Sequence, residues 1–262
     1  MPYVNINSQR LYFEDSGGSG APVILAHGFL MDHEMFAPQV AALAPEFRVI
    51  TWDERGFGLT ESDGKRFTYW DSARDCLALL DHLRIDRAVV GGMSQGGFVS
   101  LRAALTAPGR VRALVLLDTA ADVDTAETLA ANQGMLDVWA AVGPVDELAG
   151  AIATLIINEP VENARWIAKW RQRPKELLAE PGRCLISRDD ISSRLGEISC
   201  PAIVIHGEDD GALTIDRAEA MAAGLPGCSG VVRIPGAAHA ANLTHSDLVN
   251  PPLLEFLRRL PA

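Results

Sequence analysis

One serine lies in a glycine-bounded turn that has the spacing of a catalytic nucleophile. Ser94 stands in Gly92-Met93-Ser94-Gln95-Gly96, directly after the apolar run Ala88–Gly91 and directly before a helical pattern. This is a G-x-S-x-G nucleophile elbow in its required context, since the small residues two positions either side of the serine let the backbones pass closely. The N-terminus of the following helix would favour negative charge on a reacting carbonyl oxygen. The pattern predicts a serine nucleophile; the alternative is a glycine-rich turn with an incidental serine.

A serine hydroxyl becomes a good nucleophile only when an imidazole that a carboxylate orients removes its proton. The six histidines are His27, His33, His82, His206, His239 and His245. His239 follows the last apolar run, Val231–Ile234, in a loop Pro235-Gly236-Ala237-Ala238 that would carry it to the carboxyl edge of a parallel sheet. We therefore predict that His239 is the general base.

Three carboxylates stand together in one tight loop, Glu208-Asp209-Asp210, after the apolar run Ala202–Ile205. Only one of them is expected to meet the histidine. A triad of Ser94, Asp210 and His239 would follow the chain order Ser, Asp, His that accompanies this type of elbow. Asp118, at the end of an earlier apolar run, is the alternative acid.

A second turn, Ala26-His27-Gly28-Phe29, follows the apolar run Pro22–Ala26. In proteins with a nucleophile elbow of this type, such a turn supplies half of an oxyanion hole. We therefore predict that the backbone N–H groups of Phe29 and Gln95 bind the oxyanion. His27 is expected to brace the loop by hydrogen bonding; the alternative is a second candidate base.

Short β-rich runs alternate with longer helical patterns, which predicts a mostly parallel sheet with helices on both faces. The expected strands are Tyr3–Ile6, Leu11–Glu14, Pro22–Ala26, Arg48–Trp52, Ala88–Gly91, Ala113–Leu117, Ala202–Ile205 and Val231–Ile234. The first two are expected to form a hairpin at the sheet edge. The expected helices include Phe36–Leu43, Tyr69–Leu83, Gly96–Thr106, Ile215–Ala223 and Leu253–Leu260, each with a period near 3.6 residues.

The segment 119–199 breaks this alternation, because it is long and helix-like and contains no convincing strand. We predict that it is a helical cap inserted into a core of residues 1–118 and 200–262. The cap should set specificity through apolar side chains, and the predicted pocket residues are Leu30, His33, Trp139 and Trp166. The basic run from Arg165 to Lys175 is expected to be a solvated helix face; the alternative is that it meets an anionic substrate.

Composition narrows the function classes. The chain has 262 residues, 23 Lys+Arg against 34 Asp+Glu, and a net charge of −11, so nucleic-acid binding is not expected. Its apolar runs are shorter than the ~20 residues that span a bilayer. No secretory signal is visible and four cysteines are scattered, so we expect a cytoplasmic protein with reduced thiols. No metal site and no cofactor are expected, since no metal-ligand spacing occurs.

Taken together, these motifs resemble the α/β-hydrolase superfamily over nearly the whole chain. The resemblance implies an eight-stranded, mostly parallel sheet with the cap after the sixth strand. It favours Asp210 as the acid, three residues after Gly207, and it makes Asp53-Glu54-Arg55-Gly56-Phe57-Gly58 a structural turn in which Arg55 forms an ion pair. The chain looks most like small capped esterases and lactonases of the 3-oxoadipate enol-lactonase kind. It departs from them at Asn242-Leu243-Thr244-His245-Ser246, where relatives often carry a glutamate and a proline.

The resemblance implies a serine hydrolase that cleaves a hydrophobic carboxylic ester or lactone through an acyl-enzyme, as a monomer or homodimer. A serine at position 94 argues against the dehalogenases and epoxide hydrolases of this fold, which use an aspartate there. Hydrolysis of a carbon-carbon bond in ring-cleavage products, or perhydrolysis, would use the same triad. A ligand receptor of the same fold is the third interpretation, and the complete set of catalytic residues argues against it.

Overall fold

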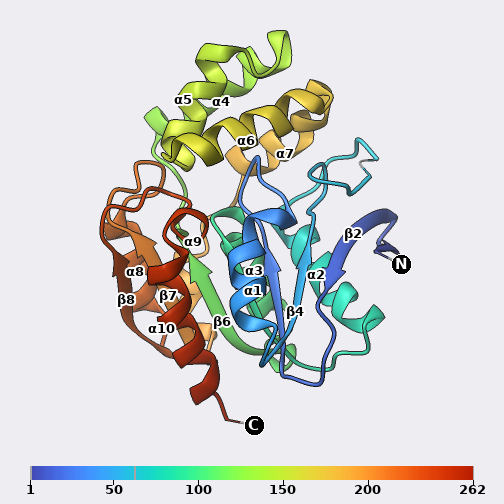
Figure 1. The fold of residues 1–262 in the computed structure, drawn as a ribbon, viewed down its shortest axis with the longest axis vertical. Coiled ribbons are helices and arrows are strands. Elements are labelled where there is room, and N and C mark those ends of the chain that lie inside the picture. The colour runs from blue at the N-terminus through green and yellow to red at the C-terminus, as the bar shows by residue number, and fades with distance from the viewer. Residues whose placement is uncertain (1, 62, 262) are drawn as a thin grey trace.

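The computed structural model describes residues 2–61 and 63–261, and its centre is one eight-stranded sheet in the order β1-β2-β4-β3-β5-β6-β7-β8 (Figure 1). The strands are β1 Tyr3–Ile6, β2 Gln9–Asp15, β3 Pro22–Ala26, β4 Arg48–Trp52, β5 Ala88–Met93, β6 Val111–Leu117, β7 Ala202–Gly207 and β8 Cys228–Ile234. The pairs β1/β2 and β2/β4 are antiparallel, and the remaining five pairs are parallel. The predicted edge hairpin and the mostly parallel sheet are confirmed.

Helices cover both faces of the sheet, which explains why its central strands are continuous apolar runs. The core helices are α1 Ala37–Leu43, α2 Tyr69–His82, α3 Gln95–Thr106, α8 Ile215–Gly224, α9 Ala241–Thr244 and α10 Ser246–Arg259. On one face, Ile24, Val90 and Leu114 pack with buried residues of α2, α3 and α8. On the other, Val23 and Val115 pack with buried residues of α1 and α10. Alternate residues of one strand thus enter opposite cores.

The final helix differs from the prediction, because it begins at Ser246 instead of Leu253 and runs through Pro251 and Pro252. A proline inside a helix removes one N–H and leaves the carbonyl four residues earlier without its partner. Those carbonyls belong here to Asp247 and Leu248, which are both exposed, so water can satisfy them.

Between β6 and β7 the chain forms four α-helices, named the cap helices below: α4 Ala126–Val142, α5 Asp146–Ile156, α6 Pro160–Gln172 and α7 Ala179–Ile186. Short 3₁₀ helices η3 Lys175–Leu178 and η4 Ser192–Glu197 complete this insert. The cap helices gather at one end of the molecule, over the loops that follow the parallel strands (Figure 1). In the described part of the chain, no helix has both the length and the apolar character needed to cross a membrane.

Candidate active site

Ser94 occupies the turn between β5 and α3 in a conformation that an ordinary residue adopts at a cost. Its φ is 52° and its ψ is −114°, and its neighbours hold it there: Ser94 N–H donates to the carbonyl of Leu117 at 2.9 Å, and Thr119 Oγ1 donates to the carbonyl of Ser94 at 2.7 Å. Such strain persists only where the surroundings fix it, and it is concentrated at functional sites. The elbow also requires Gly96, because a Cβ there would lie 1.9 Å from the carbonyl oxygen of Ala26.

The structure brings His239 and Asp210 together. Nδ1 of His239 lies 2.7 Å from Oδ2 of Asp210, and both side chains are buried. The other oxygen of Asp210 accepts the backbone N–H groups of Ala212 at 2.8 Å and Leu213 at 2.9 Å. Burial alone would raise the pKa of Asp210, but attraction to His239 and the hydrogen bonds that it accepts hold this pKa well below its ordinary value. An ionised Asp210 can therefore orient the imidazole at neutral pH.

Asp118, the alternative acid, has a different role. Its two oxygens accept the backbone N–H of Gly207 at 2.8 Å and that of Ala241 at 3.3 Å. Gly207 ends the strand before the Asp210 loop and Ala241 follows His239, so one carboxyl group ties the two loops together. Burial raises the pKa of Asp118 to about 8.

Ser94 and His239 line the same cavity, which has a volume of about 460 Å³ and opens between the cap helices and the sheet. Its lining is mainly apolar and includes Phe29, Leu30, Met93, Phe98, Met135, Ile152, Leu155, Ile156 and Leu185. Sequence reasoning did not single out Phe98, although it lies four residues after Ser94 and therefore one helical turn away on the same side. Ile152 gave no comparable signal, because its place depends on how α5 docks.

Of the two candidate oxyanion donors, Gln95 directly follows Ser94 and Phe29 lines the same cavity as Ser94. Gln95 is the first residue of α3, and Phe29 lies in a turn that Met31 N–H closes on the carbonyl of Gly28 at 3.0 Å. Neither the Phe29 nor the Gln95 backbone N–H donates to another described group of the chain. Both amides are thus available for a substrate oxygen.

His27 braces this turn, as expected. Its Nε2 accepts the backbone N–H of Glu54 at 3.0 Å, so the proton is on Nδ1, which donates to the carbonyl of Gly28 at 2.8 Å. The side chain is fully buried, and burial lowers its pKa. With both nitrogens engaged, His27 is a structural residue.

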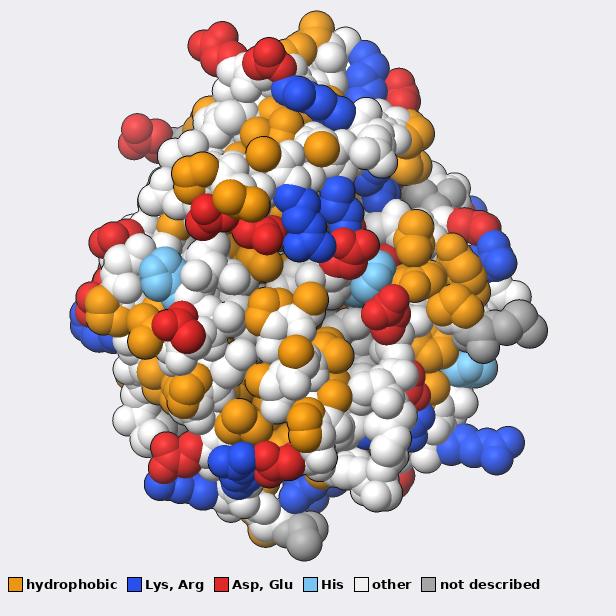
Figure 2. Space-filling view, viewed as in Figure 1, with side chains coloured by type: hydrophobic (Ala, Val, Ile, Leu, Met, Phe, Trp, Pro, Cys, Tyr) orange, Lys and Arg blue, Asp and Glu red, His pale blue; other side chains and the backbone are white. Residues whose placement is uncertain are grey.

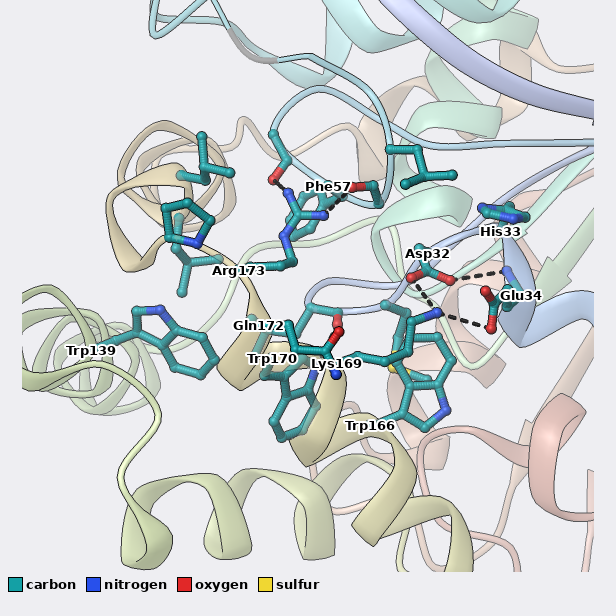
Figure 3. A pocket seen from close by; sticks show the side chains of 18 residues that line it. Asp32, His33, Glu34, Phe57, Trp139, Trp166, Lys169, Trp170, Gln172 and Arg173 are labelled. Atoms are coloured by element: carbon teal, nitrogen blue, oxygen red, sulfur yellow. Dashed lines mark hydrogen bonds and ion pairs between the residues drawn. The ribbon is translucent and has the colours of Figure 1, made fainter. Parts of the chain in front are cut away.

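Three of the four predicted pocket residues lie elsewhere. Leu30 lines the Ser94 cavity and also a neighbouring cavity of about 280 Å³ between α6 and the loops 30–34 and 56–59, whereas His33, Trp139 and Trp166 line only the neighbouring one (Figure 3). Trp166 lies there because α6 turns its tryptophan face onto the 30–34 loop, and Trp139 of α4 packs against Trp170 of the same face. His33 is moreover held by Asp53, whose Oδ1 lies 2.8 Å from His33 Nδ1.

The basic run on α6 fastens the cap to the core. Lys169 Nζ lies 2.6 Å from Oδ2 of Asp32 and 3.0 Å from Oε2 of Glu34 (Figure 3). Arg165 donates to Glu34 at 2.7 Å. Arg173 donates to the carbonyls of the 56–58 loop. Figure 2 shows Lys and Arg beside Asp and Glu at this seam between the cap helices and the sheet. No residue of the basic run is among the described residues that line the Ser94 cavity.

Among the residues that the structure describes, two buried groups combine two carboxylates with one histidine, the combination that often binds a metal: Asp32, His33 and Asp53, and Asp118, His206 and Asp210. In the second group, His206 Nε2 lies 3.1 Å from Asp210, and both carboxylates already accept N–H groups of the chain. In the first, Asp53 accepts the backbone N–H groups of His33 and Leu59. Hydrogen bonds from the chain therefore account for these oxygens. Arg55, as predicted, forms an ion pair with buried Asp75 at 2.5 Å.

This chain resembles known proteins in sequence and in structure. Residues 21–141 match the family model described as alpha/beta hydrolase fold. The chain is 31% identical to a putative non-heme chloroperoxidase of Synechocystis sp., over 98% of this chain and 100% of that protein. It is 28% identical to 3-oxoadipate enol-lactonase 1 of Acinetobacter baylyi, over 83% and 82% of the two chains.

Solved structures of an esterase and an enol-lactonase also resemble this chain. A thermophilic esterase from Thermogutta terrifontis matches with a TM-score of 0.90 and 29% identity over 99% of this chain and 98% of that one. The enol-lactonase from Burkholderia xenovorans LB400 matches with a TM-score of 0.89 and 28% identity over 98% and 100%. This chain is an enzyme of the alpha/beta hydrolase family.

Proposed function

We propose that this enzyme is a serine hydrolase that cleaves a carboxylic ester or lactone through an acyl-enzyme. One observation carries the proposal: Ser94, in its strained turn, lines the same apolar cavity as His239, whose other ring nitrogen lies 2.7 Å from Asp210. A nucleophile, a base and an orienting acid in that relation are the groups that acyl transfer needs.

In the proposed mechanism, His239 Nε2 takes the proton of Ser94 Oγ as the oxygen attacks the substrate carbonyl carbon. The carbonyl electron pair moves to the oxygen, which the N–H groups of Phe29 and Gln95 stabilise; removing one such donor typically costs ~3 kcal/mol. The imidazolium, stabilised by Asp210, gives its proton to the leaving alcohol. Water then attacks the acyl-enzyme and gives a proton to His239, which passes it to Ser94 Oγ as the product acid leaves. In a lactone the alcohol stays attached to this acid.

The cavity and the relatives both support the proposed substrate class. A cavity of about 460 Å³ with a mainly apolar lining fits a hydrophobic acyl or alcohol group. Burial of such a group is favourable by ~25 cal/mol per Å² of apolar surface. The two solved structures described above are an esterase and an enol-lactonase. We propose that residues 119–199 form the cap that sets this specificity, because α4 and α5 supply Met135, Ile152 and Ile156 to the lining.

Perhydrolysis is the second candidate, and the chloroperoxidase name of the 31% identical relative favours it. In that reaction hydrogen peroxide replaces water: its oxygen attacks the acyl-enzyme, Ser94 Oγ leaves with a proton, and a peracid is released. Comparing peracid formation with ester hydrolysis at equal peroxide and ester concentrations separates the two activities.

The first experiment measures hydrolysis of p-nitrophenyl acetate and butyrate, with a serine-directed fluorophosphonate probe in parallel. Ser94→Ala should lose both turnover and labelling, whereas Ser100→Ala, which removes a buried hydroxyl on α3 bonded to the carbonyl of Gly96, should keep both. Wild-type turnover in Ser94→Ala would contradict the proposal. Labelling of the wild type without ester turnover would instead favour carbon-carbon bond hydrolysis or ligand binding.

A further inference from the structure

The loop that carries Phe29 contains a second strained residue. Leu30 is buried and has a φ of 64°, a left-handed conformation that glycine adopts freely and leucine does not. Phe29 and Leu30 both line the Ser94 cavity, and they form the centre of the turn from Gly28 to Met31. Contacts with the surroundings must hold Leu30 in this strained conformation. Rotation about its φ angle would also move the peptide that joins Phe29 to Leu30.

The anchors of this turn come from two parts of the chain. On the core side, the carbonyl of Gly28 accepts N–H groups from His27 and Met31. On the cap side, the carbonyl of Leu30 accepts the indole Nε1–H of Trp170 at 2.7 Å, across 140 residues of sequence. The bond is buried, so its loss would leave the carbonyl of Leu30 without its partner in the chain. The core anchor fixes the start of the turn and the cap anchor fixes its strained residue.

Trp170 is itself held firmly on α6. Its side chain is 2% exposed, and its ring packs edge-on against Trp139 at 6.2 Å between centroids (Figure 3). The ion pairs of the adjacent Lys169 with Asp32 and Glu34 fasten the same helix to the residues just after the turn. The indole N–H is therefore a fixed donor and not a mobile surface contact.

We propose that Trp170 is a positioning residue: through its hydrogen bond to Leu30, the cap holds the Phe29 N–H in the orientation that completes the oxyanion hole. This inference rests on the proposed function. It assigns to the cap a part in the chemical step in addition to its part in substrate selection. A donor aimed at the developing oxyanion acts in the transition state, so its loss should lower kcat more than it raises KM.

The chain supplies a matched control one helical turn away. Trp166 lies on the same helix and is 1% exposed, but its Nε1–H is buried without a hydrogen-bond partner among the described residues. Changing either tryptophan to phenylalanine removes the same N–H and the same ring volume from the same seam. Only Trp170→Phe also removes a hydrogen bond to the turn, whereas Trp166→Phe changes the ring over which Lys169 lies.

The experiment compares wild type, Trp170→Phe and Trp166→Phe on p-nitrophenyl butyrate, with melting temperatures measured for all three. We expect kcat to fall at least tenfold in Trp170→Phe, with KM within twofold of wild type, and both constants to stay within twofold in Trp166→Phe. A trifluoromethyl ketone, which Ser94 would bind as a tetrahedral oxyanion, should lose affinity in Trp170→Phe by the factor lost in kcat/KM. Equal effects of the two substitutions, or a rise in KM alone, would overturn the inference.

A second measurement uses wild-type protein and so does not depend on the folding of a variant. In protein labelled with ¹⁵N-tryptophan and assigned by triple-resonance methods, binding of the trifluoromethyl ketone should shift the indole N–H resonance of Trp170 and leave that of Trp166 in place. Equal or absent shifts would count against the role of Trp170. Turnover by wild type and its loss in Ser94→Ala test the proposed function separately, so failure of one idea is distinguishable from failure of the other.

Discussion

Gly96 offers the sharpest structural test of the elbow, because its missing Cβ is what lets α3 approach β3. In Gly96→Ala the new Cβ would start 1.9 Å from the carbonyl oxygen of Ala26, whereas real Cβ contacts stay above 3.0 Å. The helix and the strand must therefore separate by about 1.1 Å, the difference between these distances. The new methyl group has no rotamers and the atoms that it meets are backbone, so no rotamer change relieves the clash. Overpacking of this kind typically lowers the free energy of unfolding by ~1–3 kcal/mol.

The effect should appear in both stability and rate. A loss of ~3 kcal/mol corresponds to a fall in Tm of roughly 6–12 °C for a domain of this size. Displacing the Gln95 N–H by about 1 Å should lower kcat by roughly 10²-fold, because misplacement on that scale disrupts aligned groups.

The control is Gly134→Ala, in the exposed middle of α4, where an added Cβ meets nothing within 4 Å. That variant should gain ~0.5–1 kcal/mol, since alanine favours helix more than glycine does, and should keep full activity. Differential scanning calorimetry and ester hydrolysis measure both outcomes. A Gly96→Ala protein as stable and as active as Gly134→Ala would refute the close-approach argument.

Three further predictions concern buried carboxylates. Asp210→Asn should lower kcat for p-nitrophenyl butyrate by on the order of 10³–10⁴-fold, because asparagine keeps the shape but no longer stabilises the imidazolium; a kcat within tenfold of wild type would argue against its role. Asp118 binds its proton up to about pH 8 in the native state but only to about 3.8 when unfolded, so the free energy of unfolding should fall by up to ~1.4 kcal/mol per pH unit as the pH rises between these values. Asp118→Asn removes this titration, so the free energy of unfolding, measured by urea denaturation, should fall less between pH 5 and pH 7 in the variant than in wild type. An equal fall in the two proteins would contradict the assignment. Arg55→Ala leaves fully buried Asp75 without its ion-pair partner and should lower the free energy of unfolding, measured in urea, by ~3 kcal/mol. The control Arg259→Ala removes an exposed ion pair and should lower it by under ~1 kcal/mol. Similar losses in the two variants would show that burial of the pair does not determine its contribution.

Local patterns were sufficient to predict the sheet and its order of elements. Each central strand is a short apolar run because helices cover both faces, and that requirement is written into consecutive residues. The elbow was visible for the same reason, since Gly92, Ser94 and Gly96 meet one another within a single turn. The end of the chain was harder to predict: Pro251 and Pro252 signal a break, but solvent access to two carbonyls lets α10 continue through them.

The neighbours of the candidate triad show where sequence order was enough and where it was not. Placing Asp210 and His239 after adjacent strands β7 and β8 predicts that their loops meet, and the two side chains lie 2.7 Å apart. Sequence order left Asp118 as an alternative, because it too follows a strand at this edge. Only the three-dimensional structure shows that its oxygens accept the N–H groups of Gly207 and Ala241 instead.

The amino-acid sequence by itself therefore determined the strands, the elbow and the chain order of the candidate catalytic residues, because each depends on residues close in sequence or on the fixed edge of a parallel sheet. The tertiary structure alone decided what surrounds them. The rotation of α6 places Trp166 at a second cavity and brings Trp170 to the carbonyl of Leu30, 140 residues away. An amphipathic pattern shows that a helix buries one face, but which partner that face meets depends on the packing of side chains from distant segments.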